Sequence, residues 1–358
     1  MKKYLVGAIV AGLMAVNVHA QSHVQLYGIL DAGVTYVNNL GGSRALLENA
    51  GIMQGNRWGL HGTEDLGGGL KAIFVLENGF VLNSGAFAQG GREFGRQAFV
   101  GLASARAGRV TLGRQYDFMH DALIADTAAV QVTTASGFHL LDADRLAGQR
   151  VDNAIKYLTP GFAGLRLGAL YGFSNTPDAF AGTASAPRVI SFGAMYRRGR
   201  LSLGAAYAKA DGRSGSLATE ALAGDSLRTM GLGGRYNFRR LVVFGNVTNT
   251  RLTHMAGGGN AIMNNYELGA AYQLTPAIRY GGGYTYTTFS GHPYHQINAA
   301  IHYYFSKQTD LYLGLNFQHT NNNKTGAGMF LIATPGSFKG FSTSGNQLAA
   351  RIGLRHIF

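Results

Sequence analysis

Residues 310–319 read DLYLGLNFQH, and this stretch decides the fold because its side chains alternate in character with a period of two. One face of the stretch is apolar and consists of Leu311, Leu313, Leu315 and Phe317. The positions between them hold small or polar residues such as Gly314 and Asn316. Successive side chains of a β-strand point to opposite faces, so this period predicts a strand with one apolar and one polar face.

The same alternation recurs along the chain in segments of about ten residues. Sixteen segments carry it: 24–37, 56–66, 70–80, 94–103, 109–116, 149–158, 165–174, 188–197, 201–210, 226–238, 241–252, 263–273, 278–289, 295–305, 310–320 and 344–358. Their number is even, and very short connections such as 67–69 alternate with long ones such as 117–148 and 321–343. Short turns at one end and long loops at the other are typical of outer-membrane barrels. We therefore expect an all-β fold, a 16-stranded antiparallel transmembrane β-barrel.

The composition excludes several other classes of protein. The 358 residues are 46% hydrophobic and 14% charged, which argues against a disordered chain. The longest apolar run, residues 5–16, is too short for a membrane-spanning helix, which needs about 18 or more apolar residues. The absence of cysteine excludes disulfides, thiolate metal sites and cysteine nucleophiles. We expect no cofactor, no metal and no enzymatic activity.

The first twenty residues, MKKYLVGAIVAGLMAVNVHA, have the pattern of a signal peptide. Lys2 and Lys3 precede an apolar core, and Val18 and Ala20 provide the small residues of a cleavage site. We expect residues 1–20 to be removed and residues 21–358 to form one barrel domain in the cell outer membrane. Loss of the two lysines lowers the formal net charge from +13 to +11.

The polar faces of the segments predict an open and basic interior. Glycine, whose 53 copies are unusually many, recurs in mid-strand on this face: Gly168, Gly193, Gly204, Gly269, Gly281, Gly283, Gly314 and Gly353. Ten basic residues alternate in step with the polar face of their strand, which we call inward parity: Arg57, Lys71, Arg96, Arg150, Lys156, Arg166, Arg235, Arg279, Arg351 and Arg355. The acids with inward parity are fewer: Asp31, Glu77, Asp152 and Glu267. A pore lined mainly by one sign of charge concentrates the opposite ion, so anions should pass more easily.

Six segments carry a family resemblance. They are VQLYGILDAGV at 24–34, NRWGLHGTEDLGGGLKAIFVLENGF at 56–80, GRQAFVGL at 95–102, VTLGRQYD at 110–117, RVDNAIKYLTPGFAGL at 150–165 and LRHIF at 354–358. Together they resemble the general diffusion porins of Gram-negative bacteria, of the beta-proteobacterial and neisserial type. The resemblance implies a homotrimer of sixteen-stranded barrels, each with its third outer loop folded into the lumen. It also implies that the C-terminal aromatic residue, here Phe358, is recognised by the outer-membrane assembly machinery.

The resemblance assigns roles at the pore constriction. In the family an arginine cluster on the barrel wall faces acids on the loop folded into the lumen. The matching wall positions are Arg57 in NRWGL, Arg96 in GRQAF and Arg150 in RVDNA. The matching loop is the longest connection, residues 117–148.

The acidic side of the constriction is less closely matched. HDALIAD resembles the start of the family's loop and makes Asp121 and Asp126 the acidic candidates. The acidic, proline-bearing stretch that often follows is replaced by TAAVQVTTASGF, which leaves Asp142 or Asp144 as alternatives.

Two further features bear on assembly. Residues 81–93 correspond to the family's latching loop, which reaches into a neighbouring subunit. Arg114 has outward parity near the end of its strand, where it lies either at the lipid interface or at a trimer contact.

Three functions are compatible with these patterns. The favoured one is an outer-membrane pore for passive diffusion of small hydrophilic solutes and ions, with anion preference. The alternatives are a substrate-selective channel of the same fold, and a barrel that acts as an adhesin or an enzyme. The expected partners are two further copies of the chain, the lipid bilayer with lipopolysaccharide, the assembly machinery and small anions in transit. The basic residues are spread around a lumen, so we expect no nucleic acid.

Overall fold

The stretch at 310–319 lies within strand β16 (Thr309–Thr320) of the computed structural model, and burial alternates along that strand residue by residue. Leu311 and Leu313 are 38% and 43% exposed, whereas Tyr312 between them is 1% exposed. The buried face is the inner one, because residues of the 117–148 loop pack against it. The predicted strand with one apolar and one polar face is confirmed.

The structure describes residues 23–175, 188–212, 225–253, 259–329, 332–334, 337–338 and 341–358. The expected signal peptide, residues 1–20, lies outside the described residues. The other strands of the barrel are β1 (His23–Leu40), β2 (Ser43–Ala50), β3 (Arg57–Gly67), β4 (Leu70–Gly79), β5 (Gln97–Ser104), β6 (Gly108–Tyr116), β7 (Arg150–Leu158), β8 (Leu165–Gly172), β9 (Arg188–Arg198), β10 (Leu201–Asp211), β11 (Ser226–Phe238), β12 (Leu241–Thr253), β13 (Asn260–Gln273), β14 (Ile278–Phe289), β15 (His292–Tyr304) and β19 (Asn346–Ile357). All sixteen predicted segments are confirmed, with ends that differ by three residues or fewer.

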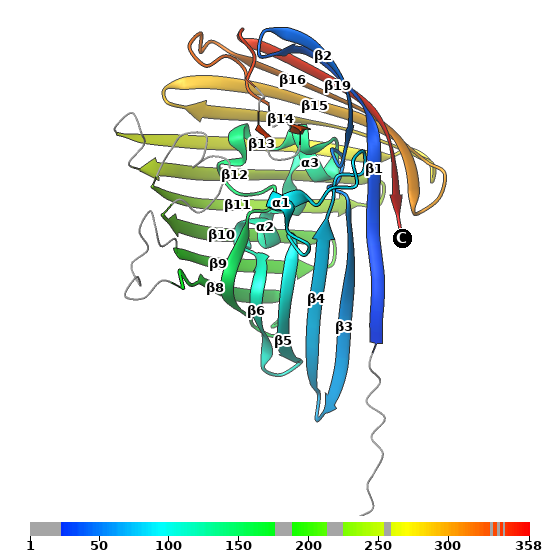
Figure 1. The fold of residues 1–358 in the computed structure, drawn as a ribbon, viewed down its shortest axis with the longest axis vertical. Coiled ribbons are helices and arrows are strands. Elements are labelled where there is room, and N and C mark those ends of the chain that lie inside the picture. The colour runs from blue at the N-terminus through cyan, green and yellow to red at the C-terminus, as the bar shows by residue number, and fades with distance from the viewer. Residues whose placement is uncertain are drawn as a thin grey trace, which may run out of the picture.

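The strands close into a barrel with antiparallel neighbours throughout the described residues (Figure 1). Closure joins β1 to β19, from the pair Ile29 and Ile357 to the pair Val37 and Ala349. The other edge of β1 pairs with β3 in its first half and with β2 in its second half. Because β2 and β3 share this edge, the 17 strands of the sheet occupy 16 positions around the barrel. β2 was not among the predicted segments.

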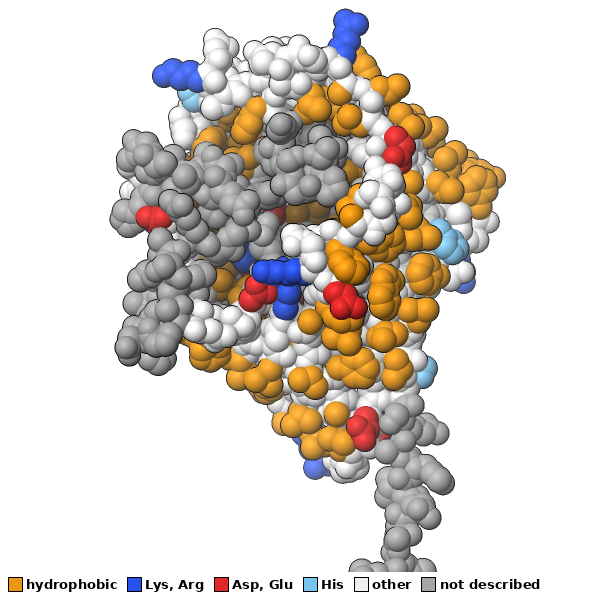
Figure 2. Space-filling view, in the orientation of Figure 1, with side chains coloured by type: hydrophobic (Ala, Val, Ile, Leu, Met, Phe, Trp, Pro, Cys, Tyr) orange, Lys and Arg blue, Asp and Glu red, His pale blue; other side chains and the backbone are white. Residues whose placement is uncertain are grey.

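The outer face of the barrel is apolar. The exposed large hydrophobic residues include Leu203, Leu232, Leu268, Ile301, Tyr303 and Phe305. Figure 2 shows hydrophobic side chains over much of the lower part of one side of the molecule. Such a surface suits contact with lipid acyl chains. No helix within the described residues is long and apolar enough to cross a membrane.

The loop between β6 and β7 folds into the barrel and consists of short helical turns. They are α2 (Phe118–Leu123), η1 (Ile124–Asp126), α3 (Ala128–Gln131), η2 (Ala135–Gly137) and η3 (Leu140–Asp142). Asp117 caps α2 by accepting hydrogen bonds from the backbone N–H of Met119 (3.0 Å) and of His120 (3.3 Å). A capping carboxylate satisfies N–H groups that have no partner within the helix.

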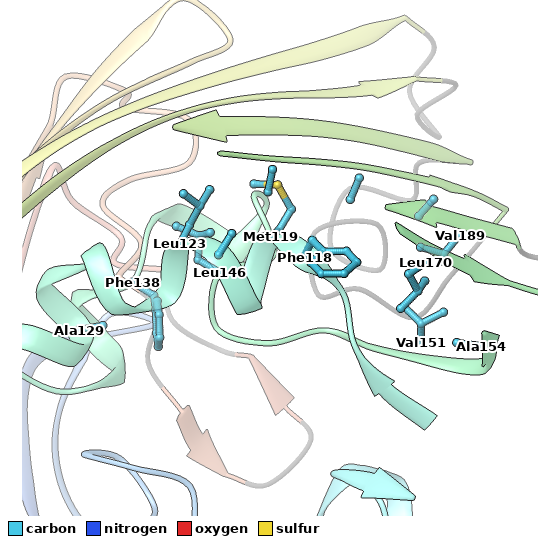
Figure 3. Packing of buried hydrophobic residues seen from close by; sticks show 14 residues of the cluster. Phe118, Met119, Leu123, Ala129, Phe138, Leu146, Val151, Ala154, Leu170 and Val189 are labelled. Carbon is cyan, nitrogen blue, oxygen red and sulfur yellow. The ribbon is translucent and has the colours of Figure 1, made fainter. Parts of the chain in front are cut away.

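Glycines of the wall make room for α2. The Phe118 ring lies where a Cβ atom of Gly168 or Gly193 would stand, at 2.0 Å and 2.6 Å from its nearest ring atoms. Phe118, Met119 and Leu123 are fully buried in one cluster with residues of β7 to β10 (Figure 3). Six of the eight mid-strand glycines that were predicted to keep the interior open lie against residues of this loop: Gly168, Gly193, Gly204, Gly281, Gly283 and Gly314.

Two small elements complete the described structure. The turn α1 (Ala88–Gly91) lies in the connection between β4 and β5. β17 (Ile332–Thr334) and β18 (Ser337–Phe338) form a two-stranded sheet of their own in the connection between β16 and β19.

Candidate functional site

Two of the three wall arginines converge on one tyrosine. Tyr116 ends β6 at the point where the internal loop begins, and its hydroxyl accepts hydrogen bonds from Arg96 Nη2 (2.7 Å) and Arg150 Nη2 (2.8 Å). The Arg150 guanidinium also lies over the Tyr116 ring, 4.7 Å from its centroid. Such a contact between a cation and an aromatic face holds the guanidinium in place.

Arg57 joins the other two from β3. Its Nε donates a hydrogen bond to the carbonyl of Gly55 (2.9 Å). A Cβ atom at Gly55 would stand 3.1 Å from Arg96 Nη1 and 4.0 Å from Arg57 Nη2, so both guanidinium groups face the same point. We call Arg57, Arg96 and Arg150 the arginine cluster. Strand parity predicted their common inward direction, and the structure brings them together.

One carboxylate balances the arginine cluster. Glu77 of β4 accepts a hydrogen bond from Arg96 Nε at 2.8 Å and another from the Tyr27 hydroxyl at 3.1 Å. It is the only carboxylate of the described residues that forms an ion pair with the cluster. Three guanidinium groups thus share a single negative charge, and the wall keeps a local positive excess.

The structure gives Asp121 and Asp126 other partners than the arginine cluster. Asp121 pairs with Lys156 of β7 at 2.6 Å, and Asp126 pairs with Arg235 of β11 at 2.8 Å. Asp126 is also 1% exposed, so its charge is largely removed from water. Among the described residues neither acid forms an ion pair with the arginine cluster, and each carboxylate pairs with another basic residue of the wall. Their role as the acidic side of the constriction stays a prediction.

Asp142 and Asp144, the alternatives, are buried in the loop itself. Asp142 accepts hydrogen bonds from the Ala147 N–H (2.8 Å) and the Gln149 amide (3.2 Å). Burial, and then the charge of Asp144, raises the pKa of Asp142 to about 7. Neither acid contacts the arginine cluster, so among the described residues no acid of this loop does.

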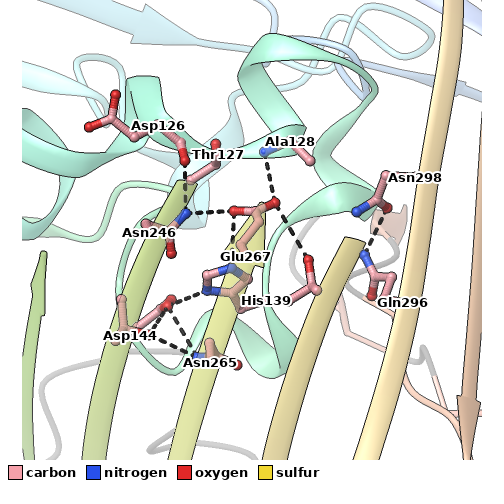
Figure 4. A network of polar contacts seen from close by, with 12 residues as sticks. Asp126, Thr127, Ala128, His139, Asp144, Asn246, Asn265, Glu267, Gln296 and Asn298 are labelled. Atoms are coloured by element: carbon pink, nitrogen blue, oxygen red, sulfur yellow. Dashed lines mark hydrogen bonds and ion pairs between the residues drawn. The ribbon is translucent and has the colours of Figure 1, made fainter. Parts of the chain in front are cut away.

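A buried histidine ties the loop to the wall. His139 lies between two carboxylates, with Nδ1 at 2.5 Å from Asp144 and Nε2 at 3.2 Å from Glu267 of β13 (Figure 4). Burial lowers the pKa of His139, but the two carboxylates raise it by more than burial lowers it. The resulting pKa is about 10. The same Glu267 accepts hydrogen bonds from the Ala128 N–H (2.8 Å) and the Asn246 amide (2.6 Å). Alternation along the strand predicted that Glu267 points inward, but no sequence pattern indicated its contact with His139, because the members of this network lie far apart along the chain.

A second buried pair closes the base of the loop. Arg145 is 1% exposed, and its Nε lies 2.5 Å from Asp117, the residue that caps α2. His120 stacks on Tyr116 with ring centroids 3.9 Å apart and bonds through Nδ1 to the Leu146 carbonyl at 3.0 Å. Burial lowers the pKa of His120 to about 3, so this ring is neutral. Asp is a common N-cap residue, which is the one sequence feature that could have marked Asp117, whereas nothing marked Arg145.

Other inward basic residues also find carboxylates. Arg355 pairs with Asp310 at 2.8 Å, and Arg351 lies 3.7 Å from Asp31. Asp310 was absent from the predicted inward acids although its parity is inward. Arg279 instead bonds to the carbonyl of Gln131, at 2.9 Å.

Asp152 corrects the predicted inward set. Its side chain is 46% exposed and pairs with Arg92 at 3.1 Å and with Arg114. The register of β6 on β7 shifts beyond Gly113, and Asn153 has a φ of 51°. This local irregularity turns Asp152 away from the inner face. Arg114, predicted to face outward, thus has a carboxylate partner within its own chain.

Phe358 lies where the barrel closes. Its backbone exchanges two hydrogen bonds with Gly28 of β1, at 2.9 Å and 3.1 Å, and its ring occupies the place of a Gly28 Cβ atom. The residue is 42% exposed. Its expected role as an assembly signal stays a prediction.

The described residues contain no group of three or more His, Cys, Asp or Glu side chains that could hold a metal ion. Fold and site define a class of protein: a transmembrane β-barrel channel with an apolar outer face, a basic wall and an internal loop. A family model described as Gram-negative porin matches residues 7–323. The chain belongs to this family of outer-membrane proteins, and both fold and family indicate a channel rather than an enzyme.

Individual relatives agree with this assignment. The outer membrane porin protein 32 of Delftia acidovorans is 32% identical over 373 residues, and the alignment covers 100% of both chains. An outer membrane porin protein of Bordetella pertussis is 34% identical over 264 residues, 66% of each chain. A solved structure titled "Anion-selective porin from Comamonas acidovorans" superimposes with a TM-score of 0.79 at 28% identity, covering 94% of this chain and 100% of that one.

Proposed function

We propose that the protein is a water-filled pore for passive diffusion of small hydrophilic solutes, with a preference for anions. The observation that carries the proposal is the arginine cluster, in which three guanidinium groups share the single carboxylate of Glu77. A basic lumen wall surrounded by low-dielectric material attracts anions and repels cations.

The positions of the loop acids support the same preference. Asp121 and Asp126 are paired with Lys156 and Arg235, away from the arginine cluster. Since these carboxylates are already neutralised, they do not offset the positive potential at Arg57 and Arg150. The similar Comamonas acidovorans protein, titled anion-selective, is consistent with this interpretation. On this proposal residues 117–148 narrow the pore, and their acids attach the loop to the wall.

A planar bilayer experiment tests the proposal. With a salt gradient across the membrane, the reversal potential of the wild-type channel should have the sign of anion preference. The double variant Arg57→Gln/Arg150→Gln leaves the Arg96–Glu77 pair in place and removes two positive charges from the lumen. We expect it to reduce the anion-to-cation permeability ratio by about tenfold or more, because the lost attraction is roughly 1 kcal/mol per charge and 1.4 kcal/mol corresponds to about a factor of ten.

The matched control is Arg239→Gln/Arg240→Gln, which removes the same charge from the exposed turn between β11 and β12. Its reversal potential should equal that of the wild type. Cation preference of the wild-type channel, or equal effects of the two double variants, would refute the assigned role of the cluster.

Three further proposals rest on the sequence. We propose that residues 1–20 are cleaved before Gln21, that Phe358 is read by the assembly machinery, and that the barrel forms a homotrimer. The trimer is supported by a protein of the same fold, OmpT of Vibrio cholerae, one of whose structures is described as a trimer form. N-terminal sequencing of the mature protein, and its mass in detergent by light scattering, test the first and the third.

A further inference from the structure

The outer face of β10 to β12 carries a row of three basic side chains. Lys209 pairs in register with Arg228, and Arg228 pairs in register with Arg251, so the three lie side by side across adjacent strands. They point away from the lumen, because the residues next to them in sequence are fully buried on the inner face: Ala208, Leu227 and Leu252. We call Lys209, Arg228 and Arg251 the basic row. It lies near the ends of the strands that lead to the long connections.

The basic row has little negative charge to balance it. Asp211 lies 3.1 Å from Lys209 Nζ but also pairs with Arg188 at 2.6 Å. Within the described part of the chain, no carboxylate forms an ion pair with Arg228 or Arg251. Arg228 Nη2 reaches only the Asn249 amide oxygen, at 3.5 Å, and its Nε is buried without a hydrogen-bond partner.

Like charges directly opposite one another destabilise a sheet, so an external anion bound between them would stabilise the row. The membrane location restricts what that anion can be. Its phosphate or carboxylate must lie at the level of the strand ends, beside an apolar wall.

An apolar groove of about 810 Å³ begins directly below the basic row, toward the middle of the strands. Its lining includes the small Ala194 and Ala205, which are cross-strand partners, and the larger Phe192, Tyr207 and Leu232. Tyr207 lies on the same outer face as Lys209 and precedes it by two residues in β10, a distance of about 7 Å along the strand. The cationic and apolar parts of the surface are therefore contiguous.

We propose that the basic row and this groove bind a phosphate-bearing membrane lipid, with its phosphate on Arg228 and Arg251 and one acyl chain in the groove. A guanidinium group donates two parallel hydrogen bonds to phosphate oxygens, and two adjacent guanidinium groups match the charge of a phosphate monoester. A free phosphate uses only the row, whereas a lipid also fills the groove. When the lipid phosphate binds, charge-assisted hydrogen bonds to it replace the repulsion between the like charges of the basic row.

Native mass spectrometry of the full-length protein in detergent tests the proposal, with dioleoyl phosphatidic acid as the probe. Dioleoylglycerol, which lacks the phosphate, and inorganic phosphate, which lacks the chains, are the comparison ligands. We expect phosphatidic acid to bind most tightly. Arg228→Gln/Arg251→Gln should weaken its binding by about tenfold or more, since each basic residue at an anionic membrane surface contributes about fivefold.

Two controls make the outcome specific. Arg239→Gln/Arg240→Gln changes the same charge at the other end of the same two strands and should bind like the wild type. Ala205→Trp fills the groove and leaves the row intact, so it should weaken phosphatidic acid binding and leave any binding of inorganic phosphate unchanged. The conductance and reversal potential of all these variants should match the wild type, which separates this proposal from the pore function.

Each other outcome overturns the inference. Equal weakening by both double variants would mean that net charge alone governs lipid binding. Inorganic phosphate that binds as tightly as phosphatidic acid would make the row a site for a soluble anion. Loss of the native oligomer in Arg228→Gln/Arg251→Gln would make the row an interface between copies of the chain.

Discussion

His139 is held between Asp144 and Glu267, and its protonation controls how firmly the internal loop attaches to the wall. Its pKa in the folded protein, about 10, lies above the ordinary value of 6.5. A raised histidine pKa means that the contribution to stability is complete below pH 6.5 and is lost as the pH rises through about 10. We therefore expect open-channel current noise to increase as the pH passes about 10, recorded in planar bilayers from neutral pH upward.

His139→Gln removes the positive charge and leaves two buried carboxylates without it. Removal of one partner from a buried ionic group costs about 3–5 kcal/mol, so the variant should unfold at lower temperature and show high noise already at neutral pH. His295→Gln is the matched control, because His295 is on the outer face, where it contacts Tyr284. A wild-type noise step that persists in His139→Gln would contradict the role assigned to this residue.

Helix α2 depends on wall glycines for its position, and Gly204 gives the sharpest test of this element. A Cβ atom at Gly204 would stand 2.2 Å from the backbone oxygen of Ala122, which cannot rotate away. Gly204→Ala should therefore displace α2 into the lumen, lower single-channel conductance and reduce thermal stability by a few kcal/mol. In Gly282→Ala the nearest atom is 3.7 Å away, so this control should conduct like the wild type. Equal conductance of the two variants would mean that the loop adapts without moving into the pore.

The strands were predictable from the sequence, whereas the internal loop was not. A strand with lipid on one face and water on the other must alternate apolar and polar side chains. Residues 310–319 alone therefore revealed the pattern of the barrel strands. β2 escaped detection because it lies in the connection that follows the first predicted segment and because SRALLENA does not alternate regularly. The loop follows no period, and its path is set by distant partners such as Gly193 for Phe118.

The same distinction holds for the candidate site. Parity placed Arg57, Arg96 and Arg150 on the inner wall, because each lies on or next to a regular strand. The partners of Asp121 and Asp126 depend on where the loop packs, and no local pattern encodes that.

At the scale of the whole molecule, the barrel separates its positive charges onto two surfaces. The arginine cluster faces the lumen, whereas the basic row faces outward at the strand ends. Other basic residues of the inner wall are neutralised by carboxylates, as Lys156, Arg235 and Arg355 are. The selectivity of the pore should therefore originate in a small region and not in the net charge of the chain.

This localisation predicts how selectivity depends on salt. The Debye length falls from about 10 Å at 0.1 M salt to about 3 Å at 1 M, so the field of the arginine cluster reaches the pore axis only in dilute salt. The anion-to-cation permeability ratio of the wild type, measured from reversal potentials at several mean salt concentrations, should decline toward the ratio of free mobilities as salt increases. Arg57→Gln/Arg150→Gln should start nearer to that limit and change little, while Arg239→Gln/Arg240→Gln should follow the wild type. A wild-type ratio that stays constant over this range would mean that anions are selected by close contact with the guanidinium groups, because contact at hydrogen-bond distance is not screened by mobile ions.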